Sequence, residues 1–300
     1  MENTTTIKDG GITYSFSKKV KSKSRNIIQN IFSELRQKSW KNSAFFDDLE
    51  ILVYGRWGET CNTKNISPFN EGFVNYPVVD ESKKITLRTK RNFLSDSIMA
   101  LIFPVMGKNK LKTVAIHELG HLFDFNFATP DPDLVSKMKE FIKSTDDISS
   151  LDNNKEFAPL AKQYCLSNGL SDSDKFNDAW RKDVELAFKG HSVKSNNKLI
   201  DKLGYYSPVN FDDCDNPLIR LDDGIDDEEI EYADRARQEV FAQLFAYAMG
   251  AEDKKSKKNL IVNTYKNSYK VVEQYINEYL GTNTQKQNMI RKKSKFDCSA

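Results

Sequence analysis

Two histidines four residues apart enclose a glutamate in the segment His117-Glu118-Leu119-Gly120-His121. In a helix of about 3.6 residues per turn, residues four apart lie one above the other, so both imidazoles can reach one metal ion. This H-E-x-x-H spacing is the signature of a helical zinc site. Zinc held by three protein ligands and one water lowers the pKa of that water to about 7, and Glu118 can take its proton. The segment therefore predicts metal-assisted hydrolysis.

The residues around this motif predict the helix that the motif needs. Apolar side chains recur at the spacing of a helix packed on a core, and we expect the helix to run from about Lys110 to Phe127. The chain has only three histidines, so chance formation of the motif is a weak alternative. The apolar positions are Ala115, Ile116, Leu119, Leu122 and Phe123.

Two histidines do not complete a zinc site, and the third ligand must come from elsewhere in the chain. The remaining histidine, His191, follows Lys189 and Gly190 in a polar context that favours a surface position. The three-histidine pattern H-E-x-x-H-x-x-G-x-x-H fails, because Asp124 and Phe127 occupy its glycine and histidine places. A carboxylate is therefore required.

Glu239 is the carboxylate that stands out, because it begins an apolar stretch that ends at Phe245. A charge in such surroundings needs a partner to offset its desolvation, and a zinc ion would be one. The alternative is that Glu239 marks the wet end of its helix and pairs with Arg235 at (i, i+4). Residue physics alone leaves these two interpretations equally open.

The remaining elements must position these side chains. Strands are expected at Leu49–Gly55 and Lys83–Lys90, separated by a long loop at Gly58–Pro77. We expect the Lys83–Lys90 strand to lie at a sheet edge, where an extended peptide could add by main-chain hydrogen bonds, and the loop to help choose its side chains. Periodicity predicts further helices near Ser17–Trp40, Leu134–Lys143, Phe157–Cys165, Lys175–Phe188, Glu229–Ala251 and Leu260–Leu280.

The two motifs together resemble the catalytic domain of anthrax lethal factor and the Pro-Pro endopeptidases. In that family the second motif is a Glu, two apolar residues, Ala and Glu, which Glu239-Val-Phe-Ala-Gln243 matches except at its last position. The resemblance implies that His117, His121 and Glu239 bind Zn²⁺.

The same resemblance implies an oxyanion donor. A tyrosine seven residues before the ligating glutamate projects into the site in that family, and Tyr232 has this place here. Tyr205 and Tyr206 are rival donors. Gln243 replaces the family's second Glu, and the two motifs are much further apart than in the relatives, so substrate specificity does not transfer.

The fold implied is α+β and mostly helical. It would be a zincin-like metalloprotease domain, with a small sheet beside the motif helix and a helical insert between the two metal motifs. We expect a flexible leader over residues 1–16, a single domain over 17–280 and a flexible tail over 281–300. Residues 128–230 would form the helical insert and an acidic loop.

The function implied is that of a zinc metalloendopeptidase, with Glu118 as general base, Tyr232 as oxyanion donor and a protein or peptide as substrate. The alternative is a catalytically silent protein that uses the same fold for metal-dependent binding or sensing. The oligomeric state is left open by the sequence.

Composition limits the partners and the compartment. A net charge of +2 dictates no partner, and no nucleic acid is expected. The longest apolar run, Ile98 to Met106, is too short to span a bilayer of about 30 Å. The four cysteines form no dense framework, which suits free thiols in a reducing compartment. They are Cys61, Cys165, Cys214 and Cys298.

The N-terminal residues are polar and lack the apolar segment of a secretory signal peptide. This is compatible with a bacterial effector or toxin that is secreted without a classical signal peptide and acts in the cytoplasm of a host cell. It is equally compatible with a cytoplasmic enzyme.

Overall fold

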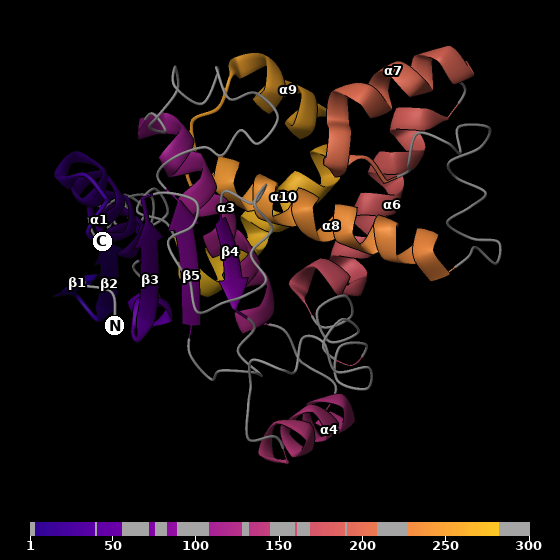
Figure 1. The fold of residues 1–300 in the computed structure, drawn as a ribbon. Coiled ribbons are helices and arrows are strands. Elements are labelled where there is room, and N and C mark those ends of the chain that lie inside the picture. The colour runs from indigo at the N-terminus through magenta and orange to yellow at the C-terminus, as the bar shows by residue number, and fades with distance from the viewer. Residues whose placement is uncertain are drawn as a thin grey trace, which may run out of the picture.

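The computed structural model shows an α+β chain, mostly helical, with one five-stranded sheet (Figure 1). It describes residues 4–39, 41–55, 72–75, 83–88, 108–127, 132–144, 160, 169–189, 191–208 and 227–281. Helix α3, Lys108–Asn126, carries the first half of the site, and helix α8, Asp227–Ala248, carries the second. The α+β, mostly helical class expected from the sequence is confirmed.

The sheet has the order β1-β2-β3-β5-β4. Strands β2, β3 and β5 run parallel, and the outer strands β1 and β4 are antiparallel to their neighbours. Buried and half-buried residues alternate along β3, as in a strand with one face on a core. The strands are β1 Thr4–Asp9, β2 Ile12–Ser17, β3 Leu49–Tyr54, β4 Gly72–Asn75 and β5 Lys83–Arg88.

The expected flexible leader over residues 1–16 is wrong where the chain is described, because residues 4–17 form the β1–β2 hairpin. Gly10 and Gly11 both have positive φ, 54° and 85°, which a two-residue turn between twisted strands requires. On β2 the side chains of Tyr14 and Phe16 are fully buried. The hairpin is thus part of the core sheet.

The expected substrate strand at Lys83–Lys90 forms, as β5, but it does not lie at the sheet edge. β5 pairs with β3 on one side and with β4 on the other. The edge belongs to β4, Gly72–Asn75, which lies within the segment expected to be a loop. The remainder of that loop, residues 58–71 and 76–77, lies outside the described residues.

Helix α1, Ser22–Lys38, crosses from β2 to β3 and buries one apolar stripe. The stripe residues are spaced i, i+3, i+4 and i+7, which is the pattern of one helix face. They are Ile28, Ile31, Phe32 and Leu35.

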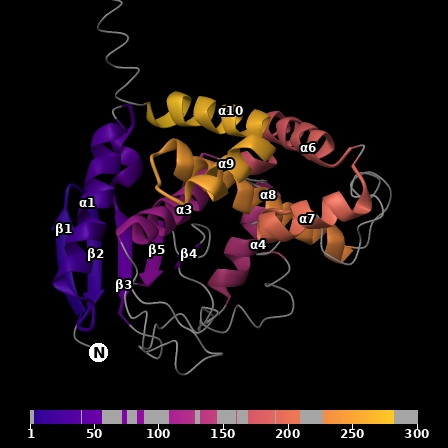
Figure 2. The same ribbon diagram turned by 90° about the horizontal axis from the view of Figure 1, so that it is seen from above.

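Helix α3, Lys108–Asn126, carries the histidine motif and lies between the sheet and helix α8, Asp227–Ala248 (Figures 1 and 2). Both helices are buried over much of their circumference, as their sequences predicted. One continuous hydrophobic cluster runs from the hairpin through both helices to the C-terminal helix α10. The metal motifs are therefore held on rigid core elements.

The segment between α3 and α8 is helical where it is described. The final helix expected at Leu260–Leu280 is interrupted at Tyr265 and continues to a π-helical turn, Ile276–Leu280. Residues 209–226 of the acidic region, the four cysteines and residues 282–300 of the expected tail lie outside the described residues. The remaining helices are η1 Ser43–Phe46, α4 Pro132–Lys143, η4 Leu170–Asp172, α6 Asp174–Phe188, α7 Val193–Leu203, η5 Gly204–Tyr206, α9 Lys255–Thr264 and α10 Lys266–Tyr275.

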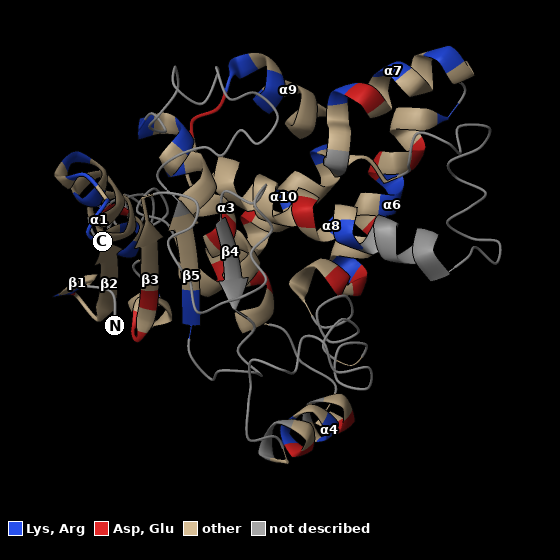
Figure 3. Cartoon of the chain, in the orientation of Figure 1, with Lys and Arg blue, Asp and Glu red and all other residues tan. Residues whose placement is uncertain are grey.

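Charged residues of both signs are spread over the helices of the described chain (Figure 3). Among the described helices, none combines the length and the apolar character that crossing a membrane requires.

Candidate metal centre

The two motif histidines leave the same face of α3. The centroids of the His117 and His121 rings are 4.9 Å apart, and the ring planes are nearly perpendicular at 89°. Their side chains are only 12% and 17% exposed. The i, i+4 spacing has thus brought two imidazoles together in a largely enclosed place, as the motif predicted.

Glu239 reaches both histidines from α8. One carboxylate oxygen, Oε2, lies 3.1 Å from Nε2 of His117, and the other, Oε1, lies 3.5 Å from Nε2 of His121. The three residues offer ligand atoms that all lie within 4.8 Å of one another. Of the two interpretations of Glu239, the structure supports the one that places it with the histidines, whereas Arg235 is exposed.

These distances fit a shared metal ion. Two ligand atoms that are each about 2.1 Å from one tetrahedral ion lie about 3.4 Å from each other. Both separations between Glu239 and the histidines are near that value. Two imidazole nitrogens and one carboxylate oxygen also form a ligand set that leaves a fourth position open. The arrangement can hold a divalent metal ion.

Gly120, inside the motif, allows α3 and α8 to approach this closely. A Cβ at this position would lie 2.9 Å from both the Cα and the carbonyl oxygen of Ala242, and 3.1 Å from Cδ1 of Phe245. Real Cβ atoms almost never approach other atoms below 3.0 Å. Only glycine fits between the two backbones without displacing one of them.

The three side chains form an ion pair when no metal is bound. Burial alone would lower the pKa of His121, but the charge and hydrogen bond of Glu239, with the charges of Glu118 and Asp124, raise it to about 9. Burial would likewise raise the pKa of Glu239, but His121 and His117 hold it well below its usual range. A proton on His121 thus balances the Glu239 carboxylate, and a metal cation would replace that proton.

Glu118 follows His117 on α3 and is only 7% exposed. Its charge is one of those that raise the pKa of His121, which places the carboxylate close to the site. This is the neighbourhood that the general-base role requires.

Asp124 is a residue whose contribution the sequence did not reveal. It is fully buried on α3, and its carboxylate accepts hydrogen bonds from Ser171 N and Ser171 Oγ, both at 2.7 Å. Burial raises the pKa of Asp124 to about 6, against the lowering effect of Ser171, His121 and Arg237. The sequence shows only an acidic residue in an apolar helix, three positions after His121. Its hydrogen-bond partner lies 47 positions away.

The tyrosines separate into different environments. Tyr232 lies in α8 seven residues before Glu239, which places its backbone two turns away, about 10 Å along the helix. The side chains of Tyr232 and Tyr205 lie outside the described part of the chain. Tyr206 is 3% exposed, and its hydroxyl donates a 2.8 Å hydrogen bond to Oε1 of Gln243.

Two polar atoms near the site are buried and have no hydrogen-bond partner among the described residues. They are Nε2 of Gln243 and Nδ1 of His117. The Gln243 amide therefore uses its oxygen, which receives the Tyr206 bond, and not its nitrogen. At His117 it is the other ring nitrogen, Nε2, that faces Glu239.

His191 is exposed in the connection between α6 and α7, and its Nδ1 lies 2.9 Å from the carbonyl oxygen of Ala187 near the end of α6. The surface position expected for this histidine is confirmed.

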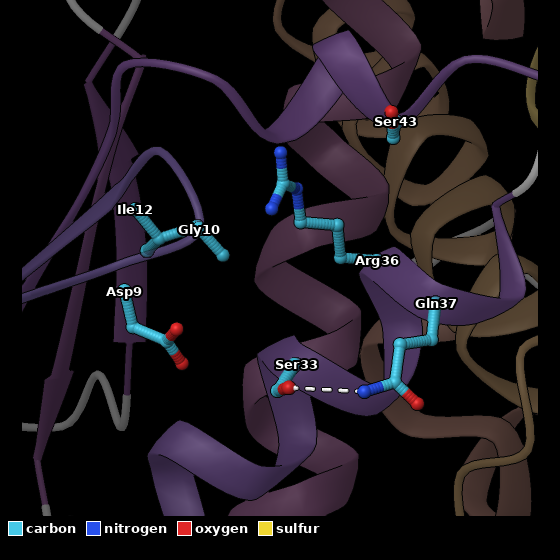
Figure 4. Close-up of a pocket in the computed structure, with 7 residues that line it drawn as sticks. All are labelled: Asp9, Gly10, Ile12, Ser33, Arg36, Gln37 and Ser43. Atoms are coloured by element: carbon cyan, nitrogen blue, oxygen red, sulfur yellow. Dashed lines mark hydrogen bonds between the residues drawn. The ribbon is translucent and has the colours of Figure 1, made fainter.

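A pocket of about 410 Å³ lies elsewhere, between the β1–β2 turn, α1 and η1 (Figure 4). Within it Arg36 donates a 3.0 Å hydrogen bond to Asp47, and Gln37 donates to Ser33. None of its lining residues belongs to the metal site. They are Asp9, Gly10, Ile12, Ser33, Arg36, Gln37 and Ser43.

No family model, curated protein or solved structure matches the chain. The resemblance to the lethal factor and Pro-Pro endopeptidase family therefore rests on the sequence motifs alone.

Proposed function

We propose that this protein is a zinc-dependent endopeptidase of the zincin type that resembles anthrax lethal factor and the Pro-Pro endopeptidases. The observation that carries the proposal is that His117, His121 and Glu239 lie together around a space that fits one metal ion, although His117 and Glu239 are 122 positions apart in the sequence. The Glu239 carboxylate lies between two largely enclosed imidazoles and needs a positive partner there, which a proton on His121 supplies in the metal-free protein and a metal cation would replace.

His117, His121 and Glu239 would hold the zinc. Bound there, zinc would supply a Lewis acid and a water of lowered pKa for the attack on a peptide carbonyl. Two histidines and one glutamate are a known ligand set of catalytic zinc sites in peptidases.

Glu118 would take the proton from the attacking water and then deliver it to the leaving amine. Its place next to His117 on α3 and its burial support this role.

Tyr232 would donate a hydrogen bond to the oxyanion of the tetrahedral intermediate. Of its rivals, Tyr206 is disfavoured because its hydroxyl already donates to Gln243.

Strand β4 replaces β5 as the proposed track for the substrate backbone. Among the described strands it is the last of the sheet, and it pairs with β5 on one side and contacts α3. An extended peptide could add to its other side by main-chain hydrogen bonds and so lie beside the helix that carries the histidines.

A second candidate is a metal-dependent binding or sensor protein on the same fold. The observation that favours it is Gln243, a neutral and buried amide whose oxygen is engaged by Tyr206 where the family has an acid.

The test that separates the candidates is cleavage of a randomised peptide pool, read by mass spectrometry with and without a metal chelator. We expect chelator-sensitive cleavage by the wild type. A matched Glu118→Gln variant should bind zinc as the wild type does and cleave nothing. Zinc binding by the wild type without cleavage across a diverse pool would favour the binding protein.

A further inference from the structure

A chain of buried polar contacts joins the two metal-ligating helices on one side of the metal site. It begins at Asp124, three residues and one helical turn after His121 on α3. The Asp124 carboxylate accepts the backbone N–H and the hydroxyl of Ser171, both at 2.7 Å. Because Ser171 lies in the short 3₁₀ turn η4, these bonds fasten that turn to α3.

The same turn is fastened to α8 by its next residue. Asp172 accepts a 2.8 Å charged hydrogen bond from Arg237, whose side chain is only 8% exposed. Arg237 lies two residues before Glu239. The turn η4 is therefore hydrogen-bonded to α3 just after His121 and to α8 just before Glu239.

The fit of the turn against α3 is close. A Cβ on Gly169 would lie 2.5 Å from Oδ1 of Asp124, so no larger residue can stand there without displacing the carboxylate. Behind the turn, the hydroxyls of Ser173 and Tyr275 lie 2.7 Å apart, which connects it to α10. The turn η4 is thus also held by α10, a third helix.

We propose that Asp124, Ser171, Asp172 and Arg237 form a polar bridge that holds α3 and α8 at the separation the metal ligands require. The proposal rests on the metal site proposed above, and it assigns these four residues as positioning residues that do not touch the metal.

The bridge matters because the ligands come from different helices. Metal–ligand distances vary by only about 0.2 Å, so the separation of α3 and α8 must be well defined. Charge-assisted hydrogen bonds have a fixed geometry and add a directional constraint to the close packing of the two helices at Gly120. The bridge contains two carboxylates and one guanidinium, so it also adds net negative charge beside a cation site.

Zinc affinity of the whole chain tests this directly. Asp124→Asn keeps the size of the side chain but removes its charge and replaces one of its two acceptor oxygens by an amide nitrogen, and Asp172→Asn weakens the link to Arg237. We expect each to raise the zinc dissociation constant by about tenfold or more, as for other residues that support metal ligands. Cobalt binding by the same variants should give an altered visible spectrum, which reports the ligand geometry.

Asp183→Asn is the matched control. Asp183 is also a buried aspartate, and it accepts four hydrogen bonds from Asn267 and Ser268 on α10, none of which belongs to the bridge. This variant should lower the free energy of unfolding while leaving the zinc dissociation constant and the cobalt spectrum as in the wild type.

If Asp124→Asn and Asp172→Asn bind zinc as tightly as the wild type and give the same cobalt spectrum, the bridge does not position the ligands. That result would leave the proposed metal site intact. Equal weakening by Asp183→Asn would also overturn the bridge, since general destabilisation would then explain the effect. If Asp124→Asn does not fold, the zinc affinity of Ser171→Ala decides instead, because this variant removes only the hydrogen bond from the Ser171 hydroxyl. Failure of the wild type to bind zinc or cobalt would instead refute the metal site itself, and the bridge with it.

Discussion

Replacement of Gly120 by alanine tests whether the close packing of α3 on α8 makes the metal site. The added Cβ would lie 2.9 Å from two backbone atoms of Ala242, and ordinary contact begins at 3.4 Å. The helices must therefore separate by about 0.5 Å, the difference between these distances, which exceeds the tolerance of about 0.2 Å for metal ligands.

Two effects of opposite sign act on the stability of the Gly120→Ala variant. Alanine favours a helix over glycine by about 0.8–1.0 kcal/mol. Overpacking of a well-filled interface costs about 1–3 kcal/mol. Because the atoms that clash belong to the backbone, we expect the packing cost to prevail and the free energy of unfolding to fall by up to about 2 kcal/mol. The zinc affinity should fall as well, because Glu239 moves away from the histidines.

Urea unfolding of the chelator-treated protein and zinc titration measure the two quantities. Ala242→Gly in the same chain is the control, and it should not rescue Gly120→Ala, since it leaves the Cα and carbonyl oxygen of Ala242 in place. An increase in stability of about 1 kcal/mol, as expected for an uncrowded helical glycine, would show that the two helices do not pack as described.

Two further predictions concern the charges and the tyrosines. In the metal-free protein the pKa of His121 is raised to about 9, so the stability that His121 contributes is complete below about pH 6.5 and is lost as the pH rises to 9. The pKa of Glu239 is lowered, so the stability that Glu239 contributes is present above about pH 4.5 and is lost in acid. The difference in the free energy of unfolding between wild type and Glu239→Gln should thus be largest between about pH 4.5 and 6.5. Above that range it should decline by at most about 1.4 kcal/mol per pH unit. A difference that stays constant up to about pH 9 would exclude the ion pair. Tyr206→Phe should cost about 1–3 kcal/mol of stability, because it leaves the buried oxygen of Gln243 without its donor, and should preserve kcat. Tyr232→Phe should instead lower kcat by about 10²–10³ with little effect on unfolding, and the reverse outcome would exchange the two roles.

The elements that the sequence predicted well are those whose signals are local. The motif helix, the strand at Leu49–Tyr54 and the buried helix that starts near Asp227 each follow from periodicity within one segment. His117 and His121 share a face for the same reason.

The hairpin at residues 4–17 was missed although its signal was present. Gly10 and Gly11 stand directly before the alternating segment Ile12–Ser17, and a Gly-Gly pair is typical of a two-residue turn. The polar composition of residues 4–9 obscures this signal. The burial of Tyr14 and Phe16 depends on α1 and β3, and no local pattern contains that information.

The order of the strands and the polar bridge depend on contacts between distant segments. Whether β5 or β4 occupies the sheet edge is decided by a pairing between strands, so the polar face of Lys83–Lys90 could not reveal it. Asp124 likewise acquires its partner from a turn 47 residues later. The cost of burying a charge made Glu239 a candidate but left its ion pair with Arg235 equally open; the ligand role followed from the resemblance, and the fold brings Glu239 to the histidines.

The most direct test of the central claim is the zinc content and affinity of the purified protein and of two single variants. The wild type should bind one zinc ion per chain. Glu239→Ala should lose most of that affinity, whereas His191→Ala, which removes the one histidine outside the site, should retain it. Equal zinc binding by wild type and Glu239→Ala would contradict the assignment of His117, His121 and Glu239 as one metal centre.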